Sequence, residues 1–217
     1  MATRLSDETL AKDWLGKNLG VSRETLDRLA LVEDMVKAEA ENQNLISRGT
    51  FDSSWTRHIV DSAQLLTFLP MPVTPDDIWL DLGTGAGFPG IVVALLAPCK
   101  MVLVESRTKR SAFLQSMVVE LGLEQRVDVV GRRLESIEGF AASHISARAF
   151  SPLDRLVPLA SRFSTEKTVW LLPKGRNAVK ELETAPKTWQ HVFHVEQSLT
   201  DDDANILMGL GRIDEKA

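Results

Sequence analysis

The residues best suited to chemistry lie in one glycine-rich segment, residues 81–90, with the sequence DLGTGAGFPG. The segment directly follows an apolar run, residues 78–80, and its end is suited to begin a helix. Glycine has no Cβ and tolerates positive φ, so this stretch of backbone can approach a bound molecule closely. Ligands of open α/β sheets bind at such strand-to-helix joins, and we therefore predict that the segment binds a nucleoside.

The glycine spacing by itself fits two nucleoside cofactors. Gly85, Gly87 and Gly90 match the dinucleotide fingerprint G-x-G-x-x-G, and Glu105 follows Gly85 by 20 residues. A carboxylate in that place accepts hydrogen bonds from the ribose hydroxyls of NAD and of S-adenosylmethionine alike. Asp81 precedes the first glycine by two residues. It favours S-adenosylmethionine, because a carboxylate attracts an amino group and a sulfonium but repels a pyrophosphate.

Two further features favour S-adenosylmethionine. Leu134 and Glu135 follow the third expected strand, where they can pack on an adenine and accept hydrogen bonds from its amino group. Only about 70 residues lie outside the α/β part, which is little for a domain that binds a hydride acceptor. An NAD-dependent oxidoreductase, and a glycine-rich turn that binds nothing, stay open as alternatives at this point.

The elements that must position these residues fall into two parts. Residues 1–70 carry apolar side chains at three-to-four spacing, which indicates an N-terminal helical extension. Ser22 is expected to cap one of its helices, and a third helix should begin after Ser53 or Ser54. Residues 71–217 alternate between strand and helix patterns. We therefore expect a Rossmann-like α/β domain there, with a mostly parallel seven-stranded sheet and helices on both faces.

The patterns also give approximate element boundaries. The expected strands span residues 78–82, 101–105, 127–131, 144–148, 168–172, 191–196 and 205–211. The expected helices span residues 89–97, 108–121, 153–163 and 176–185, with a short one near 133–140. The last two strands are separated by a tight polar turn at residues 201–203 and should form an antiparallel hairpin at the sheet edge. Pro173 removes a hydrogen-bond donor and should end the fifth strand.

The composition is that of a soluble globular protein, with 44% hydrophobic and 25% charged residues among 217. The sequence shows no signal peptide, and no apolar run approaches the ~20 residues that span a bilayer. Cys99 is the only cysteine, so no intrachain disulfide forms. We therefore expect a cytoplasmic protein with no membrane partner.

The formal net charge of −5 argues against a nucleic-acid partner, but the charge is unevenly distributed. Residues 100–180 hold 14 lysines and arginines against 8 aspartates and glutamates. A local basic face of this kind is compatible with phosphate binding. A solvated, salt-bridged surface is the alternative.

Seven separated segments, in the same order along the chain, resemble one family. They are residues 44–47 (NLIS), 57–62 (RHIVDS), 81–90, 104–110 (VESRTKR), 133–135 (RLE), 147–149 (ARA) and 174–175 (KG). On these segments the chain resembles the ribosomal small-subunit methyltransferase G family, also called glucose-inhibited division protein B. The resemblance implies a class I methyltransferase that transfers a methyl group from S-adenosylmethionine to N7 of guanine 527 in 16S rRNA. Ser47 departs from the family, in which threonine is frequent at this position.

The resemblance and the residue types together give the candidate site residues. In the family, cofactor contacts fall on positions that match Gly83, Phe88, Leu134, Glu135 and Arg148. The full set of cofactor-binding candidates is Asp81, Gly83, Gly85, Gly87, Phe88, Glu105, Leu134, Glu135 and Arg148. The RNA-binding candidates are Arg107, Lys109, Arg110 and Lys174.

Guanine N7 has an unprotonated lone pair at neutral pH, so its attack on a sulfonium methyl group needs no general base. We therefore assign no catalytic residue and expect catalysis by positioning, with N7, methyl carbon and sulfur nearly in line. His58, Arg148 and Lys174 are the candidates for positioning. A structural role at the boundary of the core is the alternative for His58, and a surface ion pair is the alternative for Arg148. No metal site is expected, because His191 and His194 face opposite sides of an expected strand.

The expected partner is 16S rRNA, either free or within the 30S subunit, and not DNA. The oligomeric state stays open, with a monomer favoured. Two alternatives remain for the function: a methyltransferase that acts on another RNA or a small molecule, and, in a different class, an RNA-binding module without catalytic activity.

Overall fold

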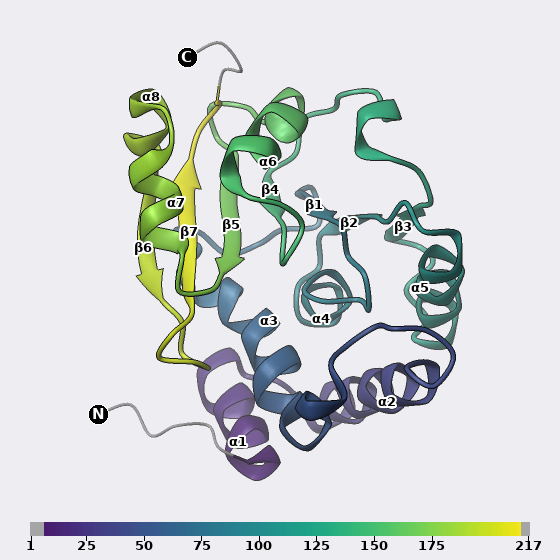
Figure 1. Ribbon diagram of the computed structural model, residues 1–217. Helices are drawn as coiled ribbons and strands as arrows, with labels where there is room; N and C mark the ends of the chain where they lie inside the picture. The colour runs from purple at the N-terminus through teal and green to yellow at the C-terminus, as the bar shows by residue number, and fades with distance from the viewer. Residues whose placement is uncertain (1–6, 214–217) are drawn as a thin grey trace.

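The computed structural model describes residues 7–213, and a seven-stranded sheet forms its centre (Figure 1). The strands are β1 (Ile78–Leu82), β2 (Lys100–Val104), β3 (Val127–Val130), β4 (His144–Ser146), β5 (Val169–Lys174), β6 (Phe193–Gln197) and β7 (Asn205–Leu210). Their order in the sheet is β3-β2-β1-β4-β5-β7-β6. Strands β1 to β5 are parallel, and β7 is antiparallel to both β5 and β6. The predicted mostly parallel sheet and its antiparallel edge hairpin are confirmed.

Helices cover both faces of the sheet (Figure 1). Successive strand residues point to opposite sides, and apolar residues on each side pack in a separate core. Trp79 packs in a core formed with the N-terminal helices, α4 (Gly90–Leu96) and α5 (Thr108–Glu120), whereas the next residue, Leu80, packs in a second core. The second core is formed with α6 (Leu153–Ala160), α7 (Ala178–Thr184) and α8 (Lys187–Gln190). Both residues are fully buried, as expected for a sheet covered on two sides.

The N-terminal helices are α1 (Glu8–Leu19) and α2 (Arg23–Glu39). Their buried side chains belong to the first core of the α/β domain. Ser22 caps α2 as predicted, since its side chain accepts a hydrogen bond from the Thr25 amide. Leu29 and Val32 of α2 lie in the same core as Trp79. Among the described residues, no helix is both long enough and apolar enough to cross a membrane.

The third helical segment, residues 48–68, differs from the prediction in its type. A 3₁₀ turn at Arg48–Ser53 precedes the predicted start after Ser53 or Ser54, and the predicted helix begins there. A π-helical turn follows at Trp55–Val60, then α3 (Asp61–Ala63) and a 3₁₀ turn at Gln64–Phe68. The apolar spacing does not reveal these changes of hydrogen-bonding pattern, and π turns often occur at functional sites.

The other boundaries agree closely with expectation, with four corrections. The expected helix 153–163 ends in a 3₁₀ turn at Ser161–Phe163, and the short helix near 133–140 is a single turn at Leu134–Ser136. Strand β4 stops at Ser146, two residues early. Pro173 does not end β5, which continues to Lys174. The reason is that β5 beyond Leu171 has no β4 partner and pairs with β7 alone.

Candidate active site

Asp81, at the end of β1, holds the glycine-rich loop in place from beneath. Its Oδ2 accepts a hydrogen bond from the Gly90 amide at 3.1 Å, and its Oδ1 accepts one from Ser146 Oγ at 2.6 Å. The carboxyl group is completely buried. Burial raises the pKa of Asp81 to about 6, although these hydrogen bonds oppose the rise. The side chain therefore fixes the loop to β1 and β4 and is not itself on a cavity surface.

Glu105 connects the loop to the end of β2. Its Oε2 accepts a hydrogen bond from the Gly85 amide at 3.2 Å, and its Oε1 accepts one from the Arg107 amide at 2.8 Å. Gly83 and Gly85 have φ values of +66° and +62°, the left-handed conformation that favours glycine. The loop can therefore lie close to the Glu105 carboxylate, with the Gly85 amide directed at it.

A cavity of about 350 Å³, here called the loop cavity, lies above these residues. It brings together four of the predicted cofactor residues: Gly83, Glu105, Leu134 and Glu135. Arg107 and Arg110 also line it, whereas Lys109 does not. Its size suits a small organic ligand. The other predicted cofactor residues, Asp81, Gly85, Gly87, Phe88 and Arg148, are outside its lining.

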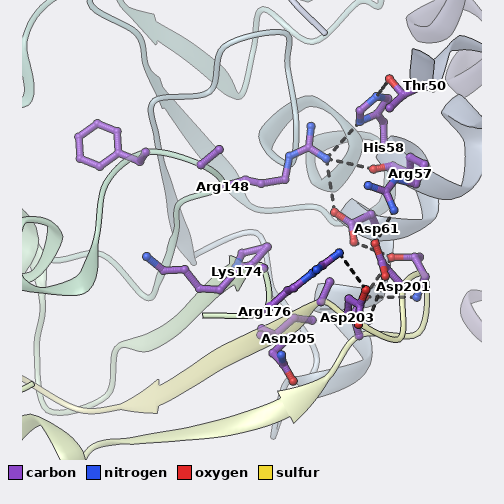
Figure 2. A pocket seen from close by; sticks show the side chains of 18 of the residues that line it. Thr50, Arg57, His58, Asp61, Arg148, Lys174, Arg176, Asp201, Asp203 and Asn205 are labelled. Carbon is purple, nitrogen blue, oxygen red and sulfur yellow. Dashed lines mark hydrogen bonds and ion pairs between the residues drawn. The ribbon is translucent and has the colours of Figure 1, made fainter. Parts of the chain in front are cut away.

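A larger cavity of about 880 Å³, here called the mouth cavity, lies between the third helical segment, the end of β4 and the β6–β7 loop (Figure 2). All three positioning candidates, His58, Arg148 and Lys174, line it. Arg57 and Arg176 join Arg148 and Lys174 as cations of its wall, which also holds four carboxylates: Asp61, Glu181, Asp201 and Asp203. The structure thus brings together residues that are more than 100 positions apart in the sequence.

Arg148 extends from the chain after β4 toward the third helical segment (Figure 2). Its Nη1 donates to the Arg57 carbonyl at 3.2 Å and lies 3.4 Å from Asp61 Oδ2. Nη1 is also 3.3 Å from His58 Nδ1. The guanidinium carbon lies 5.2 Å from the centre of the Phe88 ring, within cation–π distance. Arg148 is therefore oriented by four groups and directed into the mouth cavity.

His58 and Phe88 form a stacked pair with ring centres 5.1 Å apart. Burial, together with the neighbouring charges of Arg148 and Arg57, lowers the pKa of His58 to about 3. The imidazole is therefore neutral at physiological pH. Phe88 is 4% exposed, so its ring supports His58 and Arg148 from below instead of lining the loop cavity.

The β6–β7 loop is fastened to the third helical segment at several points. Asp61 Oδ1 accepts a hydrogen bond from Thr200 Oγ1 at 2.7 Å, and Gln64 Oε1 accepts one from the Leu199 amide at 2.8 Å. Gln64 is fully buried, and Arg57 forms an ion pair with Asp201. These contacts close one side of the mouth cavity.

Lys174 holds the chain that leaves β4. Its Nζ donates to the Ser151 carbonyl at 2.9 Å and to Glu181 Oε2 at 2.8 Å. Glu181 Oε2 also accepts a hydrogen bond from the Leu153 amide at 3.1 Å. The Lys174 side chain is 9% exposed, so its charge is already partnered within the protein. Its expected contact with RNA therefore stays a prediction.

Three residues that line the mouth cavity were not predicted from the sequence: Phe150, Glu181 and Asp201. The position of Phe150, two residues after Arg148 at the end of an expected strand, was a usable signal, because ligands bind at that edge of the sheet. No local pattern identifies Glu181 or Asp201, since their roles depend on contacts with distant segments. In the part of the chain that the structure describes, no group of three or more His, Cys, Asp or Glu side chains is placed to hold a metal.

Comparisons of sequence relate this chain to known proteins. The family described as "rRNA small subunit methyltransferase G" matches residues 26–205. A protein of that name from Sphingopyxis alaskensis is 49% identical over 215 residues, which cover 99% of this chain and 91% of that protein. Another from Rhizorhabdus wittichii is 50% identical over 203 residues, covering 93% and 91%.

Comparisons of structure find the same fold at low sequence identity. A SAM-dependent methyltransferase from Aquifex aeolicus superposes with a TM-score of 0.55 at 14% identity, covering 73% of this chain and 92% of that one. The M1A22 tRNA methyltransferase TrmK of B. subtilis gives a TM-score of 0.54 at 14% identity, covering 71% and 66%. The sheet and its helices therefore form the class I methyltransferase fold predicted from the sequence.

Proposed function

The chain belongs to the rRNA small subunit methyltransferase G family, and from this premise we propose that it methylates N7 of guanine 527 in 16S rRNA. Membership of the family makes it an S-adenosylmethionine-dependent rRNA methyltransferase. The position and the atom are our proposal, as are the 30S subunit as substrate and the cytoplasm as the place of action. One observation carries it: a nucleoside-sized cavity beside the glycine-rich loop adjoins a larger cavity, whose wall holds four lysine or arginine side chains that are each ion-paired with a carboxylate.

The loop cavity has the groups that S-adenosylmethionine requires. Each oxygen of Glu105 accepts one amide hydrogen bond and keeps a lone pair for a ribose hydroxyl. Leu134 offers an apolar surface for adenine, and Gly83 leaves the backbone accessible. When bound, S-adenosylmethionine supplies an electrophilic methyl group attached to a sulfonium. We assign Glu105, Leu134, Glu135 and Gly83 to contact with the cofactor, and Asp81 to holding the loop.

The mouth cavity suits a guanine with its phosphate. Arg148 is permanently charged and its guanidinium lines the cavity, so it can hold a phosphate oxygen beside the base. His58 is neutral and already contacts Arg148 and Thr50 through its two nitrogens. It therefore positions Arg148 and does not serve as a proton acceptor. This agrees with a nucleophile that carries its own lone pair, for which alignment is the main requirement.

The decisive experiment uses tritiated S-adenosylmethionine and 30S subunits from a strain that lacks the modification. The expected result is one methyl group per 16S rRNA, located at guanine 527 by strand cleavage at 7-methylguanosine. Subunits that already carry the modification serve as the control and should take up no label. Label at another nucleotide, or in small molecules alone, would refute the assignment. Deproteinised 16S rRNA in parallel shows whether the assembled particle is needed.

A further inference from the structure

One aromatic ring lies where the two cavities meet. Of the described residues, Ala149 and Phe150 are the two that line both the loop cavity and the mouth cavity. Phe150 is half-buried, with part of its ring packed against the second core. It is also the one Phe, Trp or Tyr among the described residues that line either cavity. The remaining aromatic group, the His58 ring, is already stacked on Phe88.

The ring of Phe150 lies directly against the glycine-rich loop. A Cβ atom placed on Gly83 would be 2.5 Å from Phe150 Cδ2, closer than any real contact. The absence of a side chain at Gly83 therefore makes room for the ring. Through this contact Phe150 reaches the end of β1, where the cofactor site begins.

The backbone holds the ring at this junction. Ala149 has a φ of +53°, a left-handed conformation that residues other than glycine rarely adopt. Such a conformation persists when neighbouring contacts determine it. Arg148 is fixed by Asp61 and His58 on one side, and Lys174 fixes the Ser151 carbonyl on the other. The position of Phe150 is therefore imposed by anchors on both sides of it.

Methyl transfer requires N7 to come within about 3–3.5 Å of the methyl carbon, so guanine and cofactor must meet at the boundary between the cavities. Proteins hold an unpaired base most simply by stacking it on an aromatic side chain. We propose that Phe150 stacks on the target guanine and sets the angle at which N7 faces the methyl group. This inference rests on the proposed function and adds the residue that positions the base.

The test compares Phe150→Leu, which keeps an apolar side chain without a ring, with Phe150→Trp, which keeps a stacking surface. We expect Phe150→Leu to lower kcat/KM for 30S subunits about 5- to 100-fold, the range set by loss of base–aromatic stacking. The Kd for S-adenosylmethionine, measured by calorimetry, should change less than about threefold. Phe150→Trp should retain most of the activity. Phe140→Leu is the matched control, because Phe140 packs on Phe163 and lines neither cavity.

Three results would overturn the inference. They are equal activity of Phe150→Leu and the unaltered enzyme, a loss in Phe150→Trp as large as in Phe150→Leu, and a fall in cofactor affinity that accounts for the whole loss. If Phe150→Leu does not fold, the result for Phe150→Trp is used alone. A decrease in its kcat/KM of more than about tenfold, with intact cofactor binding, counts against stacking. Failure of the proposed function is distinct, since the unaltered enzyme would then leave guanine 527 unmethylated.

Discussion

Arg148 Nη1 lies 3.3 Å from His58 Nδ1, and this contact fixes the tautomer of the histidine. A guanidinium can only donate hydrogen bonds, so Nδ1 of the neutral ring accepts and Nε2 carries the proton. Nε2 then donates to Thr50 Oγ1 at 3.0 Å, and Thr50 Oγ1 donates to the Ser47 carbonyl at 2.7 Å. A directed chain of hydrogen bonds therefore links the end of β4 to the turn before the third helical segment.

The neutral state of His58 makes stability depend on pH. Its pKa falls from 6.5 to about 3 on folding, so between these values the unfolded state binds more protons. The contribution of His58 is complete above pH 6.5 and is lost as the pH falls toward 3. We expect the Tm of the unaltered protein to exceed that of His58→Asn at pH 7.5, and the difference to shrink steadily by pH 4.5.

Thermal melts by circular dichroism at four pH values provide this measurement. His191→Asn is the control, because His191 lies exposed on the surface. A Tm difference between His58→Asn and the unaltered protein that stays constant across the range would contradict the neutral, buried state of His58. Asp81 titrates with the opposite sign, but it is present in both proteins and cancels in the comparison.

Arg148→Ala should act on RNA and spare the cofactor. Arg148 lines the mouth cavity and not the loop cavity, so under the proposed function its loss removes a charged hydrogen bond to the RNA. A bond of this type contributes about 1.5–3 kcal/mol, which predicts a KM for 30S subunits about 10- to 100-fold higher. Filter-binding and steady-state assays measure the effect. A matching loss of affinity for S-adenosylmethionine would move Arg148 to the cofactor instead.

Glu105→Gln should produce the converse result. The substitution keeps the shape but replaces one acceptor oxygen by a donor, which cannot accept from a ribose hydroxyl and faces the Gly85 or the Arg107 amide. We expect calorimetry to show affinity for S-adenosylhomocysteine about 10- to 100-fold weaker, with the KM for 30S subunits little changed. The exposed Glu138→Gln provides the control. Unchanged affinity would remove Glu105 from the cofactor site.

Gly83→Ala should destabilise the protein in two separable ways. Alanine would have to adopt the left-handed conformation of Gly83, with φ +66°, which is unfavourable for a residue with a Cβ. The new Cβ would also clash with the Phe150 ring. Gly122→Ala isolates the first effect, because Gly122 has φ +60° and open space around it. We expect about 1 kcal/mol for Gly122→Ala and about 2–3 kcal/mol for Gly83→Ala in urea unfolding.

Adding Phe150→Ala to each glycine variant completes the comparison. Removal of the ring should recover stability in the Gly83→Ala background and not in the Gly122→Ala background. Equal effects in the two backgrounds would show that the ring does not rest on Gly83 in solution.

Local features of the sequence predicted much of the fold and part of the site. The loop at residues 81–90 and Glu105 were predictable because a strand, a turn and a helix follow one another within a short stretch. The contact between Asp61 and Thr200 was not, since it joins residues 139 positions apart and no local pattern relates them. Lys174 was a positioning candidate and lines the mouth cavity, but its partner Glu181 was not predicted.

The error at Pro173 has a similar origin. A proline interrupts a strand that is paired on both sides, and the sequence does not reveal that β4 is too short to reach this residue. Residues whose roles depend on how far a neighbouring strand extends are therefore beyond the reach of local patterns.

The early end of β4 determines how the chain that carries Arg148 and Phe150 leaves the sheet. β1 continues to Leu82 and β5 to Lys174, so the sheet has a gap at its carboxyl edge where β4 is missing. The chain that leaves β4 crosses this gap, carrying Arg148 and Phe150 with it. Two more paired residues in β4 would draw that chain into the ladder and impose the alternation of a strand on it. The positions of Arg148 and Phe150 thus depend on β4 pairing that ends at Ser146.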